Sequence, residues 1–207
     1  MRVCLASAPT VAELADLEPV VREEDGLRVP LGVLTLAAAL ERAGIAPRVV
    51  DLDLENAAWR RDLSGGRDFA RYAAARLARE GADLYGLGSL CSSYPLTLRI
   101  ATALRELRPG AALVLGGPEA TATADETLAA FPAVDAIVRG EADETLPRLV
   151  AALSEGGDLA RVAGISFRSR GGRRVRTPDA PPIGDLDALP PAAFHLYEGR
   201  RDARLPV

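Results

Sequence analysis

The chain has 207 residues, of which 48% are hydrophobic, and a formal net charge of −4. This length suits one α/β domain with a sizeable core and an appendage. The acidic balance argues against a nucleic-acid binder, because such proteins need a basic face to meet phosphates. No apolar run approaches the ~20 residues of a membrane span. Two cysteines and no leader-like segment at Met1 predict a cytoplasmic protein.

Short apolar segments alternate with helical patterns through residue 157. This alternation predicts βαβ units and therefore a parallel sheet with helices on both faces. At this length the expected fold is Rossmann-like (flavodoxin-like), with a five-stranded parallel sheet in the order 2-1-3-4-5. The strands are predicted over 2–6, 47–52, 83–88, 113–115 and 134–138, and the helices begin near Pro30, Asp68, Leu96, Thr123 and Leu146.

Two connections are predicted to lack regular structure. Residues 7–29 form a long acidic connection, and connections of that length are often functional. Residues 53–67 are polar and are expected to be irregular around Trp59. By contrast, Thr123 and Glu126 have the spacing of a capping box, which predicts a regular start for the fourth helix.

The chain after residue 157 has a different character. Segments 164–168 and 173–177 flank Gly171 and Gly172, which predicts a β-hairpin on the edge of the sheet. The remainder is rich in proline, has no helical periodicity and is expected to be extended. The predicted organisation is an α/β domain over 1–157, a hairpin over 158–178 and a proline-rich linker over 179–207.

The carboxyl ends of the strands are where an open parallel sheet binds ligands. Residues 113–121 have the sequence Leu-Val-Leu-Gly-Gly-Pro-Glu-Ala-Thr, so two glycines follow a buried strand. Without β-carbons a large flat ligand can lie against the backbone there, although a tight turn with no ligand fits equally well. Glu141, directly after Gly140, is expected to accept hydrogen bonds from a ligand.

Several common sites lack the residues that they require. The loop after the first strand, 6–10, has no glycine and cannot form the turn that admits the pyrophosphate of a dinucleotide. The chain has no lysine, which excludes a Walker phosphate loop and the acid–lysine cluster of a receiver domain. Asp143 and Glu144 crowd the start of the fifth helix, where their charge repels a phosphate.

Four short motifs, taken in order, resemble the cobalamin-binding domain at the amino end of B12-dependent radical SAM proteins. The matching pieces are Pro30-Leu-Gly32, Leu84-Tyr-Gly-Leu-Gly-Ser89, Gly116-Gly-Pro-Glu-Ala-Thr121 and Gly140-Glu-Ala-Asp-Glu-Thr-Leu146. The resemblance implies that the corrin lies over the loop ends and that its nucleotide tail threads between strands. The cofactor-binding residues then expected are Ser7, Pro9, Thr10, Gly88, Ser89, Leu90, Ser92, Ser93, Gly116, Gly117, Pro118, Glu119, Thr121, Gly140 and Glu141.

Two departures refine what the resemblance implies. The Asp-x-His-x-x-Gly signature is missing and the sole histidine is His195, so the cobalamin is expected to be base-off with no protein histidine ligand. There is no Cys-x3-Cys-x2-Cys motif for a [4Fe-4S] cluster, so the chain is not expected to be catalytic alone. S-adenosylmethionine and the cluster would belong to a radical SAM barrel that is missing from this chain or is a separate subunit.

Three functions remain open on the sequence. The first is a cobalamin-binding module that positions the corrin for methyl transfer or related radical chemistry. The second is a stand-alone Rossmann-like enzyme that acts on a nucleotide-linked substrate, with Asp51, Ser89 and Glu141 lining its cleft. The third is an interaction domain with an empty crevice.

Overall fold

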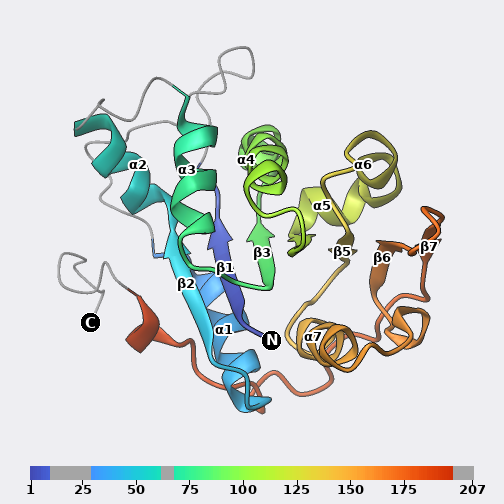
Figure 1. Cartoon of the computed structure of the whole chain (residues 1–207). Helices are drawn as coiled ribbons and strands as arrows, with labels where there is room; N and C mark the ends of the chain where they lie inside the picture. The colour runs from blue at the N-terminus through green and yellow to red at the C-terminus, as the bar shows by residue number, and fades with distance from the viewer. Residues whose placement is uncertain (10–28, 62–67, 198–207) are drawn as a thin grey trace.

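A single seven-stranded sheet forms the centre of the computed structural model, which describes residues 1–9, 29–61 and 68–197 (Figure 1). The strand order is β2-β1-β3-β4-β5-β6-β7, and the first five strands are parallel, as predicted. The strands are β1 Val3–Ser7, β2 Pro47–Asp51, β3 Leu84–Gly88, β4 Ala112–Gly116, β5 Ala136–Val138, β6 Ile165–Arg168 and β7 Arg174–Arg176.

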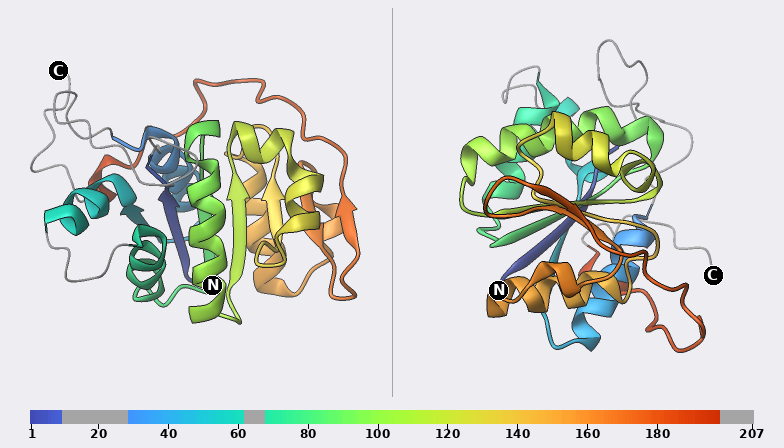
Figure 2. Two further views of the ribbon diagram at one scale, coloured as in Figure 1. Left: turned by 90° about the horizontal axis from the view of Figure 1, so that it is seen from above. Right: turned by 90° about the vertical axis from the view of Figure 1, so that its right-hand side faces the viewer.

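Helices cover both faces of the sheet, and each face has its own apolar core (Figure 2). One face packs against α3, α4, α5 and α6, whereas the other packs against α1 and α7. No described helix is both long and apolar enough to cross a membrane. The helices are α1 Leu31–Arg42, α2 Leu52–Arg61, α3 Phe69–Ala78, α4 Tyr94–Leu107, α5 Pro118–Ala122, α6 Ala124–Ala130 and α7 Thr145–Glu155, with short 3-10 turns η2 Cys91–Ser93, η3 Leu159–Arg161 and η4 Phe194–Leu196.

Helix α2 corrects the prediction of an irregular segment after the second strand. Asp51 Oδ1 accepts a hydrogen bond from Asp53 N at 2.9 Å and so caps the helix. Leu52 and Trp59 are buried, and the Trp59 ring lies 5.4 Å from that of Phe69. The helix leaves a weak signal in the sequence because only one of its faces is apolar, while its other residues are polar or charged.

The predicted capping box at Thr123 is also wrong. Thr123 Oγ1 donates to the Glu119 carbonyl oxygen at 2.8 Å, so the hydroxyl points back into the preceding turn. The helix predicted there is consequently two short helices, α5 and α6, which meet at Thr123.

The hairpin forms as predicted and extends the sheet by two antiparallel strands. Arg139, which is 3% exposed, fixes this extension from the end of β5. Its guanidinium donates to the Thr177 carbonyl oxygen at 2.7 Å and to Ser166 Oγ at 3.2 Å, and it pairs with Asp179 at 2.9 Å. Because the arginine is buried and multiply bonded, the start of the segment after β7 is held in place.

The segment after β7 returns along the domain on the side of α1 and α7, outside the carboxyl ends of the strands (Figure 2). Ile183 N donates to Glu141 Oε2 at 2.8 Å, and Ala193 N donates to the Leu34 carbonyl oxygen at 3.0 Å. Tyr197 is 1% exposed and packs into the core of that face. This part of the predicted linker, 179–197, therefore lies against the domain.

Asp51 is buried between the helix that it caps and the Tyr197 side chain. Burial raises its pKa to about 6, with a further increase from the Asp53 carboxylate, although hydrogen bonds from the α2 backbone and the nearby Tyr197 hydroxyl oppose the shift. An acid with a raised pKa in the folded state favours folding below pH 4, and this contribution is lost as the pH rises to about 6.

We expect Asp51→Asn to remove this pH dependence, because asparagine caps a helix equally well and carries no charge. Between pH 4 and pH 7 the wild-type chain should lose about 2 kcal/mol of unfolding free energy relative to the variant. Urea unfolding of both proteins across this range measures the difference. Parallel pH profiles would contradict the assignment.

Candidate functional site

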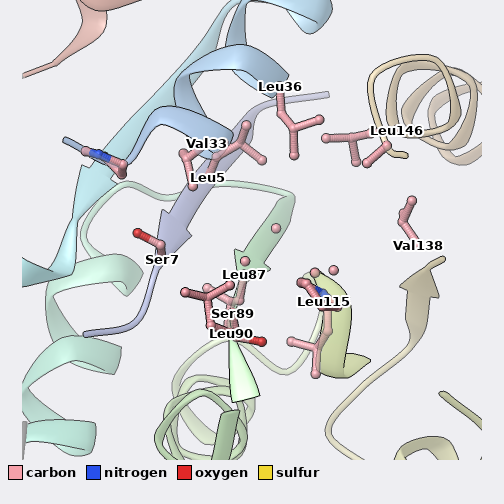
Figure 3. A pocket seen from close by; sticks show the side chains of 18 of the residues that line it. Leu5, Ser7, Val33, Leu36, Leu87, Ser89, Leu90, Leu115, Val138 and Leu146 are labelled. Atoms are coloured by element: carbon pink, nitrogen blue, oxygen red, sulfur yellow. The ribbon is translucent and has the colours of Figure 1, made fainter. Parts of the chain in front are cut away.

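A cavity of about 510 Å³ opens at the carboxyl ends of β1, β3 and β4, between α1 and α7 (Figure 3). We call it the α1–α7 groove. The parallel register fixes its floor. Leu5, Gly86 and Val114 form one row across the three strands, and Ser7, Gly88 and Gly116 form the next row toward the strand ends. We call these the deep row and the mouth row.

Glycine makes the floor of the groove from backbone. A β-carbon on Gly88 would lie 3.8 Å from Val33 Cγ2, and one on Gly116 would lie 3.8 Å from the Val138 carbonyl oxygen. Side chains could therefore occupy both positions, and their absence leaves the space open. At Gly86 the space is already used, because a β-carbon there would lie 2.7 Å from Leu5 Cδ2.

The walls of the α1–α7 groove are apolar. Leu36 from α1 and Leu146 from α7 point toward one another across it, with Val33 and Val138 nearby (Figure 3). Among the described residues, the charged members of the lining all follow the ends of strands, so they stand at the mouth; they are Asp53, Glu141 and Asp143. The arrangement suits a ligand with a flat apolar part inside and hydrogen-bond donors outside.

The loops after β3 and β4 touch through their backbones. Gly117 has φ +105° and ψ 172°, a conformation that glycine alone adopts readily, and a β-carbon on it would lie 2.1 Å from the Ser89 carbonyl oxygen. Ser89 N donates to the Gly116 carbonyl oxygen at 3.2 Å. Ser89 belongs to the lining of the groove, and its Oγ is buried and has no hydrogen-bond partner. A buried hydroxyl without a hydrogen-bond partner is unusual in a folded protein, and a bound ligand could supply the missing partner.

Thr121 joins the loops after β4 and β5. Its hydroxyl donates to the Gly117 carbonyl oxygen at 2.9 Å and accepts from Gly140 N at 3.1 Å. The residue thus fixes the relative positions of two loops at the mouth without lining the groove itself.

Ten of the predicted site residues line the groove, and five do not. Pro9 is buried nearby, Ser92, Glu119 and Thr121 lie outside the lining, and Thr10 falls outside the described residues. Ser93 Oγ is engaged with Leu90, whose backbone N donates to it at 3.0 Å. The lining members are Ser7, Gly88, Ser89, Leu90, Ser93, Gly116, Gly117, Pro118, Gly140 and Glu141.

The interior of the groove was missing from the sequence prediction. The interior is formed by apolar residues within strands and helices, whereas the sequence motifs lie at the ends of strands. The interior residues are Leu5, Val33, Leu36, Gly86, Val114, Val138 and Leu146. Gly86 carried a usable signal, because a glycine inside a buried strand marks a close approach. The alternative function, a stand-alone Rossmann-like enzyme, predicted a cleft lined by Asp51, Ser89 and Glu141. Ser89 and Glu141 line the groove, whereas Asp51 is 3% exposed and lies outside the lining.

Two curated proteins match about half of the chain. An anaerobic magnesium-protoporphyrin IX monomethyl ester cyclase from Synechocystis is 39% identical over 104 residues, 50% of this chain and 21% of that protein. An uncharacterized methyltransferase from Pyrococcus horikoshii is 32% identical over 115 residues, 55% of this chain and 25% of that protein. The chain thus spans a quarter or less of the length of these relatives.

Two solved structures share the fold. The cobalamin-dependent S-adenosylmethionine radical enzyme OxsB, with aqua-cobalamin and S-adenosylmethionine bound, has a TM-score of 0.69 and 17% identity over 94% of this chain and 24% of its own. The radical S-adenosylmethionine methyltransferase TsrM from Kitasatospora setae, with cobalamin and a [4Fe-4S] cluster bound, has a TM-score of 0.63 and 22% identity over 92% of this chain and 31% of its own.

A family model described as "B12 binding domain" matches residues 18–150. This match covers more than half of the chain. It includes β2 to β5 but not β1. It also includes the loops after β3, β4 and β5 that border the groove. The chain therefore belongs to the B12-binding domain family.

Proposed function

We propose that the chain is a cobalamin-binding module that positions a base-off corrin for methyl transfer or related radical chemistry. The observation that carries the proposal is the α1–α7 groove, with its backbone floor and the buried Ser89 hydroxyl that lacks a partner. Both features lie at the strand ends, where parallel sheets bind ligands.

The groove and its mouth match the two halves of cobalamin. The nucleotide tail carries a flat apolar base, which suits the space between Leu36 and Leu146. The corrin is a broad ring fringed with amide groups, which suits the glycines of the mouth row and carboxylate acceptors beside them. Glu141 Oε2 accepts a hydrogen bond from Ile183 N, so the other carboxylate oxygen, Oε1, is the acceptor left for a ligand.

The base-off state follows from this placement. A base held inside the groove is detached from the cobalt, and no histidine lies among the described residues that line the groove. His195 Nε2 instead lies 2.8 Å from Glu41 Oε1, on the outer side of α1. When bound, cobalamin supplies a cobalt centre that carries a methyl group or an electron, and the protein supplies its position and surroundings.

The rest of the catalytic machinery is proposed to lie outside this chain. Cys4 is buried in β1 and Cys91 is exposed in η2, so the two thiols do not form a cluster site. A radical SAM barrel, fused or as a separate subunit, would hold the [4Fe-4S] cluster and S-adenosylmethionine. A chain with only two cysteines, one buried and one exposed, also fits the reducing cytoplasm.

Retention of hydroxocobalamin tests the binding function. After mixing and desalting, we expect the protein to remain coloured at one cobalamin per chain. After reduction, the electron paramagnetic resonance spectrum of cob(II)alamin should show cobalt hyperfine lines without nitrogen splitting. Loss of the colour on desalting would overturn the proposal, and nitrogen splitting would overturn the base-off assignment.

A further inference from the structure

We infer that residues 179–197, which we call the strap, are held to the domain by a latch between Tyr197 and Asp51 that is strong in acid and weakens as the Asp51 carboxyl ionises. The inference does not depend on the proposed function. It concerns how firmly the C-terminal part of the described chain lies against the sheet.

The first part of the strap is attached through exposed polar contacts. Asp179, whose side chain is 77% exposed, pairs with Arg139 at 2.9 Å. At the mouth of the groove, Ile183 N donates to Glu141 Oε2 at 2.8 Å. Exposed polar contacts contribute little stability, because water competes for the same groups. Most of the docking strength therefore has to come from the other end of the strap.

The end of the strap is part of the apolar core. Ala193 is 2% exposed and Tyr197 is 1% exposed, and both belong to the core beneath α1 and α7. Ala193 N donates to the Leu34 carbonyl oxygen at 3.0 Å, which joins the strap to α1. Burial of a side chain as large as tyrosine contributes more than an exposed ion pair does. Tyr197 is thus the anchor of the strap.

The anchor lies beside an acidic group that is itself buried. Asp51, the last residue of β2, is 3% exposed, and its Oδ1 caps α2. Its Oδ2 and the Tyr197 hydroxyl are both buried, and neither atom has a hydrogen-bond partner in the described part of the chain. The two groups act on each other electrostatically, so they lie close together. A buried carboxylate with an unpaired oxygen favours any state in which water reaches it.

Ionisation of Asp51 therefore opposes docking of the strap. Burial raises the pKa of the docked carboxyl to about 6, whereas release of Tyr197 would admit water and return the pKa toward its ordinary value of 3.8. A carboxyl whose pKa is raised in the docked state favours docking below about pH 4, and this contribution is lost as the pH rises through about 6.

The other charged groups around the latch act in the same direction or lie apart from it. From α2, the Asp53 carboxylate raises the pKa of Asp51 further. The neighbouring strand β1 has no charged residue, and the charged residues of α1 are Glu41 and Arg42, both in its last turn. On the strap, His195 Nε2 lies 2.8 Å from Glu41 Oε1, so protonation of the imidazole makes this contact an ion pair and also favours docking in acid.

Hydrogen–deuterium exchange of residues 192–197 tests the latch on the full chain, with each rate divided by that of an unstructured peptide at the same pH. We expect the protection of these amides to fall about fifty-fold between pH 4 and pH 7 in the wild-type chain. In Asp51→Asn, which keeps the cap, protection should change by less than about three-fold, because only the exposed His195–Glu41 pair still titrates. Protection that does not depend on pH in the wild-type chain, or an unaltered pH dependence in the variant, overturns the inference.

Substitutions on the strap locate its anchor. Tyr197→Ala should lower the protection at pH 4 about a hundred-fold, because it removes the buried ring. Leu186→Ala is the matched control, since Leu186 is a large apolar strap residue that is 65% exposed, and it should leave the protection unchanged. Equal losses in the two variants would place the anchor elsewhere and count against the latch.

Tyr197→Phe separates the hydroxyl from the ring. The variant keeps the packing and removes the group that lowers the pKa of Asp51. It should match the wild-type chain at pH 4, where Asp51 is protonated, and be about three-fold less protected at pH 7. A Tyr197→Phe protein as well protected as the wild-type chain at pH 7 would show that the phenol and the carboxyl do not form a latch.

Discussion

Replacing Gly117 by alanine is expected to lower the free energy of unfolding by about 2–4 kcal/mol. Gly117 has φ +105°, and the added β-carbon would lie 2.1 Å from the Ser89 carbonyl oxygen. That oxygen belongs to the backbone, so relief requires the loops after β3 and β4 to separate. Chemical denaturation of the variant and the wild-type chain measures the loss.

Gly116→Ala is the control for this prediction. Its β-carbon would lie 3.8 Å from the nearest atom, the Val138 carbonyl oxygen, and the backbone there does not require glycine. We expect a change below about 1 kcal/mol. If Gly117→Ala is as stable as Gly116→Ala, the contact between the two loops is not what holds the mouth of the groove together.

Gly88→Val is expected to weaken cobalamin binding at least a hundred-fold while the protein stays folded. Valine suits a strand, and the β-carbon position is in ordinary contact, 3.8 Å from Val33 Cγ2 and from the Ala6 carbonyl oxygen. The side chain would stand in the mouth row and occupy the space that the ligand needs. Visible absorbance after desalting, together with circular dichroism, separates binding from folding.

A matched substitution elsewhere shows whether the effect is local. Gly184 lies outside the groove lining, and a β-carbon on it would meet nothing within 4 Å. Gly184→Val should therefore retain cobalamin like the wild-type chain. Normal retention by Gly88→Val would mean that the ligand does not pass over the mouth row.

The parallel sheet and the mouth of the groove could be predicted because each leaves a local mark on the sequence. Apolar strands alternate with helices, Gly116-Gly117 stands at the end of β4, and Gly140-Glu141 follows β5 after one residue. Loops after parallel strands meet at one edge, so residues far apart in sequence could be grouped without coordinates.

The interior and the C-terminal attachments could not be predicted, because they depend on packing between distant segments. Leu36 and Leu146 have the pattern of ordinary core leucines, and only the spacing of α1 and α7 leaves a groove between them. Helix α2 was hidden by its polar outer face. The burial of Tyr197 and the hydrogen bond from Ile183 to Glu141 join positions with no local signal.

The central claim is that cobalamin occupies the α1–α7 groove from the strand ends. Anomalous scattering at the cobalt edge, from crystals of the chain loaded with hydroxocobalamin, tests it most directly. We expect one cobalt peak outside the mouth row of Ser7, Gly88 and Gly116, with nucleotide density between Leu36 and Leu146. A cobalt peak elsewhere on the molecule, with the groove free of ligand density, would contradict the account.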